Sequence, residues 1–391
     1  HNDALVKWSG VFSQAEYSNG MLSAFLNISA SNSAYKRIDY FKKKDLILSD
    51  TTLIEAIGTH PYYGVMVSDT LIVNGLEYTI YSKEVQPTST DWKWIKGYTF
   101  KTGANINLDE YNNVFLNLGY ISKAPRFQNI FDYDNTLFKD IKNEIVKAVE
   151  VGYSYRSSSF SSNINSYYTI WENKPTKGIS YIDQDENLIK GNINGLNALH
   201  KGVEVDLSYQ LNQKIILEGL VSLGDWIWTS ENSVRLYDEN NNAILDQNNN
   251  PVDTAFNAKG VHVGDAAQTQ YGISIRYEPT YSSYIKLRGT YFGDYYSDFD
   301  PLSLYGDFGG TESWQIPTYQ LVDLHAGYKF KLLDNQIDIK LSVLNLLNEI
   351  YISDAQNNDK YNTSFQDFDA KSAGVFFGLG RRYNISAKFR F

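Results

Sequence analysis

Histidine, the side chain that most often carries acid–base or metal chemistry near neutral pH, occurs five times in the 391 residues. The positions His1, His60, His200, His262 and His325 share no spacing typical of a metal site. His325 lies on the polar side of an alternating segment with Asp323, where hydrogen bonding fits better than catalysis. The motifs GxxxxGK[ST], HExxH, GxSxG and CxxC are missing, and there is no cysteine. We therefore predict a protein that is not an enzyme and holds no resident metal or cofactor.

One stretch, residues 238–253, offers oxygen ligands of the kind that calcium accepts. It reads Asp-Glu-Asn-Asn-Asn-Ala-Ile-Leu-Asp-Gln-Asn-Asn-Asn-Pro-Val-Asp, with carboxylate and amide oxygens at two-residue spacing. It lacks the glycine and the closing glutamate of a calcium loop. A turn-rich hairpin is the favoured interpretation, and a calcium site stays open as the alternative.

Large aromatic residues gather where alternating segments run into long connections. Rigid rings give contact area at a small entropy cost, and they suit both sugar faces and aromatic ligands. The predicted ligand contacts are Trp226, Trp228, Tyr295, Tyr296 and Trp314. The alternative for each is a role in loop packing or in an interfacial girdle.

The elements that must position these residues are β-strands. Tyrosine occurs 31 times and phenylalanine 20 times, and short apolar runs are separated by Asn, Ser, Asp and Gly. No apolar run approaches the ~20 residues of a membrane-spanning helix. A net charge of −10 makes nucleic acid an unsuitable partner.

Strict alternation of apolar and polar residues predicts thirteen strands. They lie near residues 4–17, 21–34, 93–108, 113–123, 145–155, 160–173, 199–210, 214–229, 267–278, 283–295, 317–331, 337–348 and 375–391. Residues 137–149 can also be drawn as an amphipathic helix. A soluble β-sandwich or β-solenoid is the alternative fold, but these strands are long beside the usual ~5–6 residues.

The connections alternate between tight turns and long loops, such as 18–20 followed by 35–92, and 109–112 followed by 124–144. Short turns on one side and long loops on the other are typical of an antiparallel, up-and-down transmembrane β-barrel. In a bilayer a closed sheet pairs all backbone groups, apolar side chains face lipid and polar ones face the lumen. Aromatics near strand ends, such as Tyr155 and Tyr209, would form interfacial girdles.

Several segments resemble elements of one known family. Residues 378–391 alternate and end in phenylalanine, and resemble the terminal strand that the barrel-assembly machinery recognises. In that signal the contributing residues would be Tyr383, Ile385, Phe389 and Phe391. The run Asn-Leu-Leu-Asn-Glu-Ile-Tyr at 345–351 is similar to an element of TonB-dependent receptors. Residues 113–127, 143–153 and 167–174 follow in that family's order.

The resemblance is to the carboxy-terminal part of a TonB-dependent receptor, most like those of Bacteroidetes, and is clearest over residues 93–391. It implies a 22-stranded barrel around an amino-terminal plug. Residues 1–391 would then be a single barrel segment, and the plug and about nine strands would lie outside this chain. An odd strand number fits that view, as does a start at His1 without methionine or export signal, typical of a mature or truncated piece. Lumen-phase charges at Glu150, Glu204, Arg276, Lys286 and Arg288 would contact the plug or serve a polar lumen.

The function that the resemblance implies is active transport across the bacterial outer membrane. Extracellular loops would capture a scarce nutrient, such as a ferric siderophore, and the TonB complex would drive its import through the plug. Further expected partners are outer-membrane lipid, the barrel-assembly machinery and a surface lipoprotein. The long loops would be extracellular, and the short turns and carboxy terminus periplasmic. A passive porin-like channel and a surface adhesion barrel remain the alternatives.

Overall fold

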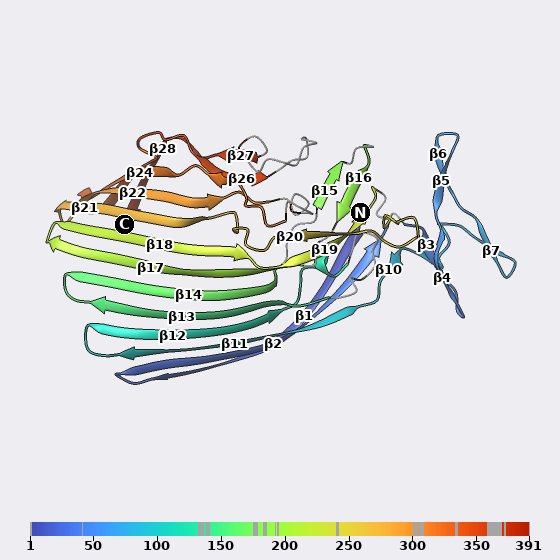
Figure 1. Cartoon of the computed structure of the whole chain (residues 1–391), viewed down its shortest axis with the longest axis horizontal. Helices are drawn as coiled ribbons and strands as arrows, with labels where there is room; N and C mark the ends of the chain where they lie inside the picture. The colour runs from blue at the N-terminus through green and yellow to red at the C-terminus, as the bar shows by residue number, and fades with distance from the viewer. Residues whose placement is uncertain are drawn as a thin grey trace.

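The computed structural model describes residues 2–40, 42–131, 137, 141–174, 179–182, 186–191, 193, 195–239, 242–299, 304, 309–332, 335–357, 370 and 373–390. One antiparallel sheet carries most of them (Figure 1). Its strands follow one another in chain order, and each strand between the two edges pairs with the strand before and the strand after it on the path. The path runs through β1 (Asn2–Ser18), β2 (Leu22–Asp39), β11 (Lys93–Asn107), β12 (Asn112–Lys123), β13 (Glu144–Arg156), β14 (Phe160–Lys174), β17 (Leu196–Asn212), β18 (Ile215–Trp228), β21 (Ala267–Thr280), β22 (Ser283–Tyr296), β24 (Tyr319–Leu332), β25 (Asn335–Leu344) and β28 (Arg382–Arg390).

Each of the predicted strands overlaps one strand of this path, so the antiparallel up-and-down order is confirmed. The total of 22 strands stays a prediction. The short strands β10 (Thr88–Ser89) and β23 (Gln315–Ile316) pair with β2 and β22 at the margin of the sheet.

Two boundaries near the end of the chain were predicted wrongly. The strand expected at 337–348 stops at Leu344, because Asn345 and Asn348 adopt positive φ values of 51° and 57°. The strand expected at 375–391 is two strands. Residues of β27 (Ala373–Phe377) pair with β26 (Ile352–Asn357) outside the main sheet, and only β28 belongs to it.

The helical alternative for residues 137–149 is wrong where the structure describes them. Residues 141–143 are irregular, and β13 begins at Glu144, with each residue from Glu144 to Tyr155 paired to β12. The apolar residues Ile145 and Val149 are four apart, which fits a helix face and equally one side of a strand. Residues 138–140 lie outside the described residues.

Short polar side chains set the tight turns. Asn19 Oδ1 accepts the backbone N–H groups of Met21 and Leu22, at 2.9 and 2.7 Å. Asp109 Oδ1 does the same for Tyr111 and Asn112, at 2.7 and 2.8 Å. Such side-chain caps replace backbone pairing where a strand reverses. Equivalent bonds from backbone N–H groups to side-chain oxygens occur at Ser157, Asn212 and Thr280.

The register places like residues in rows across the sheet, which gives it an apolar face and a polar face. One apolar row passes from Val205 to Val221 and Tyr271, and then to Tyr291. Residues of this face are exposed, with Ile273 71% and Val151 52% accessible. Since no described element covers it, this face needs an apolar medium. The polar face carries residues such as Asn117, Glu150, Asn165 and Arg288.

Aromatic rings line the apolar face near the tight turns. The rings of Tyr111, Tyr155, Phe160 and Tyr209 follow one another at centroid distances of 6.4, 5.9 and 6.3 Å. Amphipathic rings prefer the interface between lipid and water. This row is the girdle expected at the short-turn end.

The packed apolar cores lie at the long-loop end. A four-stranded sheet of β15 (Ile179–Ile182), β16 (Leu188–Gly191), β19 (Glu231–Tyr237) and β20 (Asp253–Asn257), here called the cap, packs on Trp228 and Leu196. The loop before β13 carries the 3-10 helix η1 (Phe127–Asn129), and Asn129 Nδ2 donates to Ile193 O at 3.0 Å. Several long loops thus form one body above the sheet.

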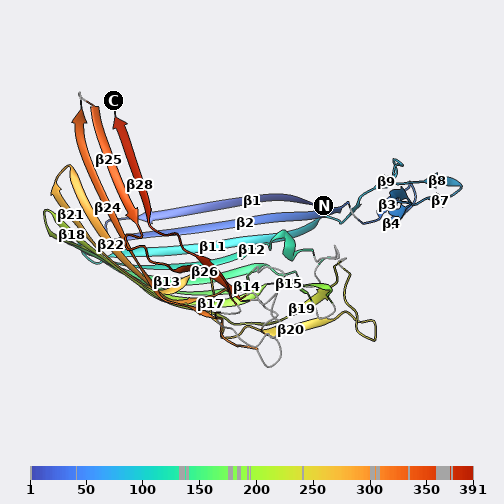
Figure 2. The same cartoon turned by 90° about the horizontal axis from the view of Figure 1, so that it is seen from above.

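Residues 42–87, here called the arm, form a separate body with its own core of Leu46, Ile57 and Val85. The arm consists of short strands: β3 (Lys44–Ile47), β4 (Thr52–Ile57), β5 (Thr59–Tyr62), β6 (Val65–Ser68), β7 (Leu71–Val73), β8 (Leu76–Tyr78) and β9 (Val85–Gln86). Figure 2 shows that the arm projects past the long-loop end and that the main sheet curls between its edge strands β1 and β28. Among the described residues, none belongs to an apolar helix long enough for a membrane span.

Candidate functional site

Three aromatic rings stack across the polar face at the long-loop end. Trp171 of β14 lies parallel to His200 of β17, with ring centroids 5.7 Å apart and planes at 9°. His200 lies in turn against Trp226 of β18, at 5.3 Å and 13°. We call these three residues the mouth stack. The strand register creates it, because His200 is the direct partner of Trp226.

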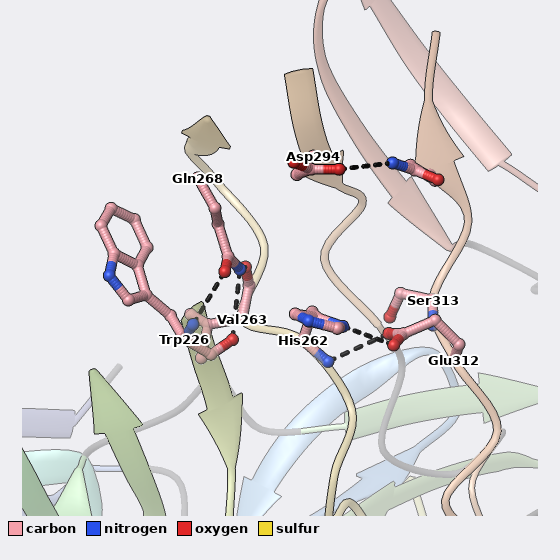
Figure 3. Close-up of polar contacts among 8 residues, drawn as sticks. Trp226, His262, Val263, Gln268, Asp294, Glu312 and Ser313 are labelled. Carbon is pink, nitrogen blue, oxygen red and sulfur yellow. Dashed lines mark hydrogen bonds and ion pairs between the residues drawn. The ribbon is translucent and has the colours of Figure 1, made fainter. Parts of the chain in front are cut away.

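The sheet beneath fixes the orientation of the mouth stack. Trp226 Nε1 donates a hydrogen bond to Tyr167 Oη at 2.8 Å. Gly202, the cross-strand partner of Tyr167, leaves room for that ring, since a Cβ at Gly202 would overlap it. Gln268, almost fully buried, accepts from Trp226 N at 2.7 Å and donates to Trp226 O at 3.1 Å (Figure 3). Hydrogen bonds therefore fix Trp226 at both its backbone and its indole ring.

A lysine completes this aromatic surface. Lys174 Nζ lies 4.7 Å from the ring centroid of Trp171 and 5.1 Å from that of Trp228. An ammonium over an indole face is an attractive cation–π contact. Among the described residues, His200 Nε2 and Trp228 Nε1 are buried without a hydrogen-bond partner. Buried polar atoms of this kind are completed in most proteins by water or by a ligand.

A second stack joins two long loops beside the first. The rings of His262 and Tyr296 lie 4.2 Å apart with planes at 4°. Glu312 accepts from His262 N at 3.0 Å and from Ser313 N at 2.9 Å, and its second oxygen pairs with His262 Nδ1 at 2.5 Å (Figure 3). The predicted contact Tyr296 is half-buried in this arrangement.

A chain of hydrogen bonds, here called the collar, ties neighbouring strand ends together around the mouth stack. Asn143 Nδ2 donates to Lys96 O at 2.7 Å, and Asn173 Nδ2 donates to Asn143 O at 2.9 Å. Asn173 N donates to Asn197 Oδ1 at 2.9 Å, and Asn197 N donates to Ser230 Oγ at 3.1 Å. The collar thus holds the ends of β11, β14, β17 and β18 at fixed spacing.

Three of the predicted aromatic contacts are packed inside the protein. Trp228 is 6% exposed within the core beneath the cap. Tyr295 is 7% exposed and donates to Ser353 O at 2.8 Å, and Trp314 packs against the same cluster. In this structure these rings anchor loops, whereas Trp226 and Tyr296 belong to the two stacks.

Sequence reasoning missed Trp171 and His200 as members of the site. The signal was present, since both alternate in phase with polar-face residues of their strands. Their meeting depends on the register between strands, which the sequence does not state.

The predicted polar-face charges all lie on that face, but their partners are within the sheet. Glu150 accepts from Asn117 Nδ2 at 3.1 Å and Asn165 Nδ2 at 2.8 Å, and Glu204 faces Asn165 across β14 and β17. The remaining three form ion pairs: Arg276 with Glu278 at 2.6 Å, Lys286 with Glu218, and Arg288 with Asp323 at 2.6 Å.

The residues of the predicted assembly signal take the apolar face of β28. Tyr383, Ile385 and Phe389 pair with Val343, Leu341 and Ile337. All three are exposed, as residues that meet lipid would be. Phe391 lies outside the described residues.

The oxygen-rich stretch at 238–253 uses its carboxylates in turns. Asp238 Oδ1 accepts from Asn242 N at 2.8 Å, and Asp246 Oδ1 accepts from Asn248 N and Asn250 N, both at 2.8 Å. The N–H of Asn250 is the main cause that holds the pKa of Asp246 below its ordinary value. No group of three metal-binding side chains occurs in the described part of the chain. Residues 240 and 241 lie outside it.

Comparison with known proteins places this geometry in a family. The family described as TonB dependent receptor-like, beta-barrel matches residues 24–346. The copper transporter OprC superposes with a TM-score of 0.60 at 10% identity, over 99% of this chain and 48% of that one. The ferric yersiniabactin uptake receptor FyuA from Yersinia pestis gives 0.54 at 13% identity, over 100% and 46%. The ferric-catecholate import receptor Fiu from E. coli, in its open form, gives 0.51 at 11%, over 99% and 42%.

No curated protein sequence matches this chain. The chain spans less than half the length of these three solved structures. At such low identity the solved structures show only the shared fold, whereas the family match over residues 24–346 shows family membership. The chain therefore belongs to the TonB-dependent receptor β-barrel family, whose members are bacterial outer-membrane proteins.

Proposed function

We propose that this chain is the barrel part of an outer-membrane receptor that captures a scarce nutrient and imports it actively. The observation that carries the proposal is the mouth stack. It presents Trp171, His200 and Trp226 on the lumen face, at the end where the long loops meet. A rigid aromatic wall with unpaired buried nitrogen atoms suits a ring-bearing ligand that also offers acceptor oxygens.

A ferric siderophore is the ligand class that we propose. Its aromatic or chelating rings would lie against the mouth stack, and its oxygen atoms would meet His200 Nε2 and Lys174. Two of the similar structures are described as a ferric-catecholate import receptor and a ferric yersiniabactin uptake receptor, which supports the proposal by likeness. We propose no enzymatic step.

The proposed orientation puts the long loops outside the cell and the tight turns and the carboxy terminus in the periplasm. A plug from the part of the protein that precedes these residues would fill the lumen and contact Glu150 and Glu204. Through it the TonB complex would supply energy. Outer-membrane lipid would cover the apolar face, the barrel-assembly machinery would recognise β28, and a surface lipoprotein would contact the long loops.

The test is uptake by intact cells. Cells carrying the protein are given a panel of radio-iron-loaded siderophores, with and without a protonophore that collapses the proton gradient. We expect one siderophore to accumulate only in energised cells, and Trp226→Ala to reduce that accumulation by about tenfold. Trp94→Ala is the matched control, because Trp94 lies in the apolar phase, opposite Ala34, and is 53% exposed.

Accumulation that persists after the protonophore would contradict active transport and favour the passive channel. Binding without any accumulation would favour the adhesion barrel. If Trp226→Ala and Trp94→Ala changed siderophore accumulation equally, the mouth stack would not be part of the ligand-binding site.

A further inference from the structure

The lumen face of the last three strands carries a stripe of positive charge. Its members are Lys329 and Lys331 on β24, Lys340 on β25, and Arg382, Lys388 and Arg390 on β28. We call these six residues the basic stripe. The register puts them on one face: Lys329 and Lys388 flank Asp338, Lys331 and Arg390 flank Gln336, and Lys340 lies opposite Ser386.

The basic stripe runs along the strands rather than across them. On β28 it extends from Arg382 to Arg390, and eight residues of an extended strand cover about 27 Å. That length is close to the apolar band of a transmembrane barrel, about 25 Å tall. The stripe thus reaches from near the long-loop end to the tight-turn end, which is the direction of transport through a barrel.

Most of the positive charge in the basic stripe is uncompensated. Asp338 pairs with Arg390 at 3.1 Å and accepts from Gln336 Nε2 at 2.7 Å. Within the described part of the chain, Lys329, Lys340 and Lys388 form no ion pair, and all three are exposed. A surface lined by one sign of charge raises the local concentration of ions of the opposite sign.

The facing strands carry the opposite sign. Glu150 on β13 and Glu204 and Asp206 on β17 lie on the same lumen face as the basic stripe. The two regions meet where Glu218 of β18 pairs with Lys286 of β22. An anion inside this lumen would therefore be repelled from the middle strands and attracted to β24, β25 and β28.

We propose that the basic stripe is a binding path for an anionic ligand, a chelate or small molecule that carries several carboxylate, catecholate or sulfonate oxygens. The inference rests on the proposed import function and adds the charge of the ligand and the wall along which it moves. The ammonium and guanidinium groups gather over three successive rows, from Lys331 and Arg390 to Lys340, and Arg382 lies further along β28. Such an axial series suits a small anion that moves between neighbouring sites. An acidic polypeptide would instead cover the stripe permanently, and the experiment separates the two.

The experiment uses the intact protein, purified from outer membranes in detergent, and pyranine, a fluorescent trianion, as the probe. Fluorescence anisotropy measures its affinity. We expect saturable binding that weakens steeply as salt is raised, because exposed charges are screened by ions. The triple variant Lys329→Gln, Lys340→Gln and Lys388→Gln is expected to bind about tenfold more weakly. The triple variant Lys329→Arg, Lys340→Arg and Lys388→Arg, which keeps the three positive charges, should bind pyranine as tightly as the wild type.

The matched control changes three exposed lysines elsewhere, Lys83→Gln, Lys214→Gln and Lys259→Gln, with the same loss of net charge. It should leave the affinity for pyranine within about twofold. Equal losses in the two triple variants would reduce the effect to net charge and overturn the proposal. So would an intact protein that does not bind pyranine, since the stripe would then be covered by polypeptide.

Failure of the inference is distinguishable from failure of the proposed function. One outcome is uptake that depends on the proton gradient while pyranine binds equally well to the wild type and to the basic-stripe variant. That result would contradict the basic stripe as a binding path and leave active transport in place. Conversely, pyranine binding that needs the basic stripe, together with uptake that does not depend on the proton gradient, would support the binding path and contradict active transport.

Discussion

The ring of Phe115 lies directly over Gly152, its cross-strand partner on the neighbouring strand. A Cβ placed on Gly152 would overlap that ring and would approach the carbonyl oxygen of Ile164 to 3.0 Å. The same relationship joins Phe25 to Gly103 and Tyr284 to Gly327 on the lumen face. The absence of a side chain on each glycine thus lets the ring lie flat against the sheet, and the ring covers the glycine backbone.

The first prediction concerns this pairing. Gly152→Ala should lower the free energy of unfolding by about 1–3 kcal/mol, because the added methyl group must displace a ring and faces fixed backbone. Urea unfolding of the protein in lipid vesicles measures the change. Gly119→Ala is the control, since a Cβ there would meet only Ala148 Cβ at 3.8 Å. A loss in the control as large as that in Gly152→Ala would show that the ring contact is not the cause.

The second prediction concerns the collar. Asn173→Ala removes the hydrogen bond to Asn143 O and places alanine at a φ of 54°. Asn173→Gly removes the same hydrogen bond, but tolerates that backbone conformation. Both variants should lose stability, and the alanine variant should lose about 1 kcal/mol more. Thermal melting in detergent ranks the three proteins, and equal melting of wild type and Asn173→Gly would mean that the side chain does not hold the collar.

The third prediction concerns acid and the arm. The pKa of Asp69 is held below its ordinary value, first by the hydrogen bond with His60 Nδ1 at 2.9 Å and then by the N–H of Gly58 at 3.1 Å. A lowered pKa in the folded state means that the carboxylate stabilises the arm above the pKa of the unfolded chain. That contribution is lost as the pH falls through the folded value.

Hydrogen exchange of residues 57–70 at neutral pH and near pH 3 measures this effect, since ordinary aspartate titrates around 3.9. Protection should fall in acid in the wild type. Asp69→Asn should start with weaker protection and show little further loss. An acid-induced loss of equal size in Asp69→Asn would assign the sensitivity to another group.

The fourth prediction concerns the middle ring of the mouth stack. His200→Phe keeps an aromatic ring between the two indoles, whereas His200→Ala leaves a gap. Each aromatic contact is worth about 0.5–1.5 kcal/mol, so His200→Ala should be less stable than His200→Phe by about 1–3 kcal/mol. Calorimetry in detergent compares them. If the proposed ligand reaches His200 Nε2, which is buried without a partner, both variants should accumulate less siderophore than the wild type. Accumulation at the wild-type level in His200→Phe would limit His200 to the stacking role.

The sequence predicted the main sheet because one physical rule governs it. Lipid on one side and water on the other impose strict alternation, and every strand of the path displays it. The tight turns were predictable for a local reason, since Asn19, Asp109 and Asn212 cap their own turns. The long loops obey no such rule, and the strands of the cap and the arm were not predicted.

The end of β25 shows why boundaries failed. Apolar residues continue at Leu344 and Leu346, although they fall in the polar phase of the strand, and the predicted strand was therefore too long. The structure stops it at Asn345, whose side-chain oxygen accepts from Glu349 N at 2.8 Å and whose amide donates to Glu349 O at 2.8 Å. Tyr351 then packs over Gly378 and stacks on Tyr319 at 4.5 Å. These partners are distant in sequence, so the family resemblance of residues 345–351 was visible before its structural cause.

Only some of the residues of the candidate site could be predicted from the sequence. Trp226 and Tyr296 stood at strand ends and belong to the stacks. Trp228 and Tyr295 stood at equivalent places and are buried, because the cap and the hairpin of β26 and β27 cover them. Nothing in the local sequence distinguishes the two outcomes, since burial depends on loops that fold back from elsewhere.

The most direct test of the account is the intact mass and peptide map of the protein extracted from outer membranes. If these strands are part of a plugged receptor barrel, the protein should have a mass well above the 44.6 kDa of this chain. Peptides from a plug should accompany it. A mature protein that begins at His1 and still inserts into the membrane would contradict the receptor, and a barrel completed by a second chain would become the better description.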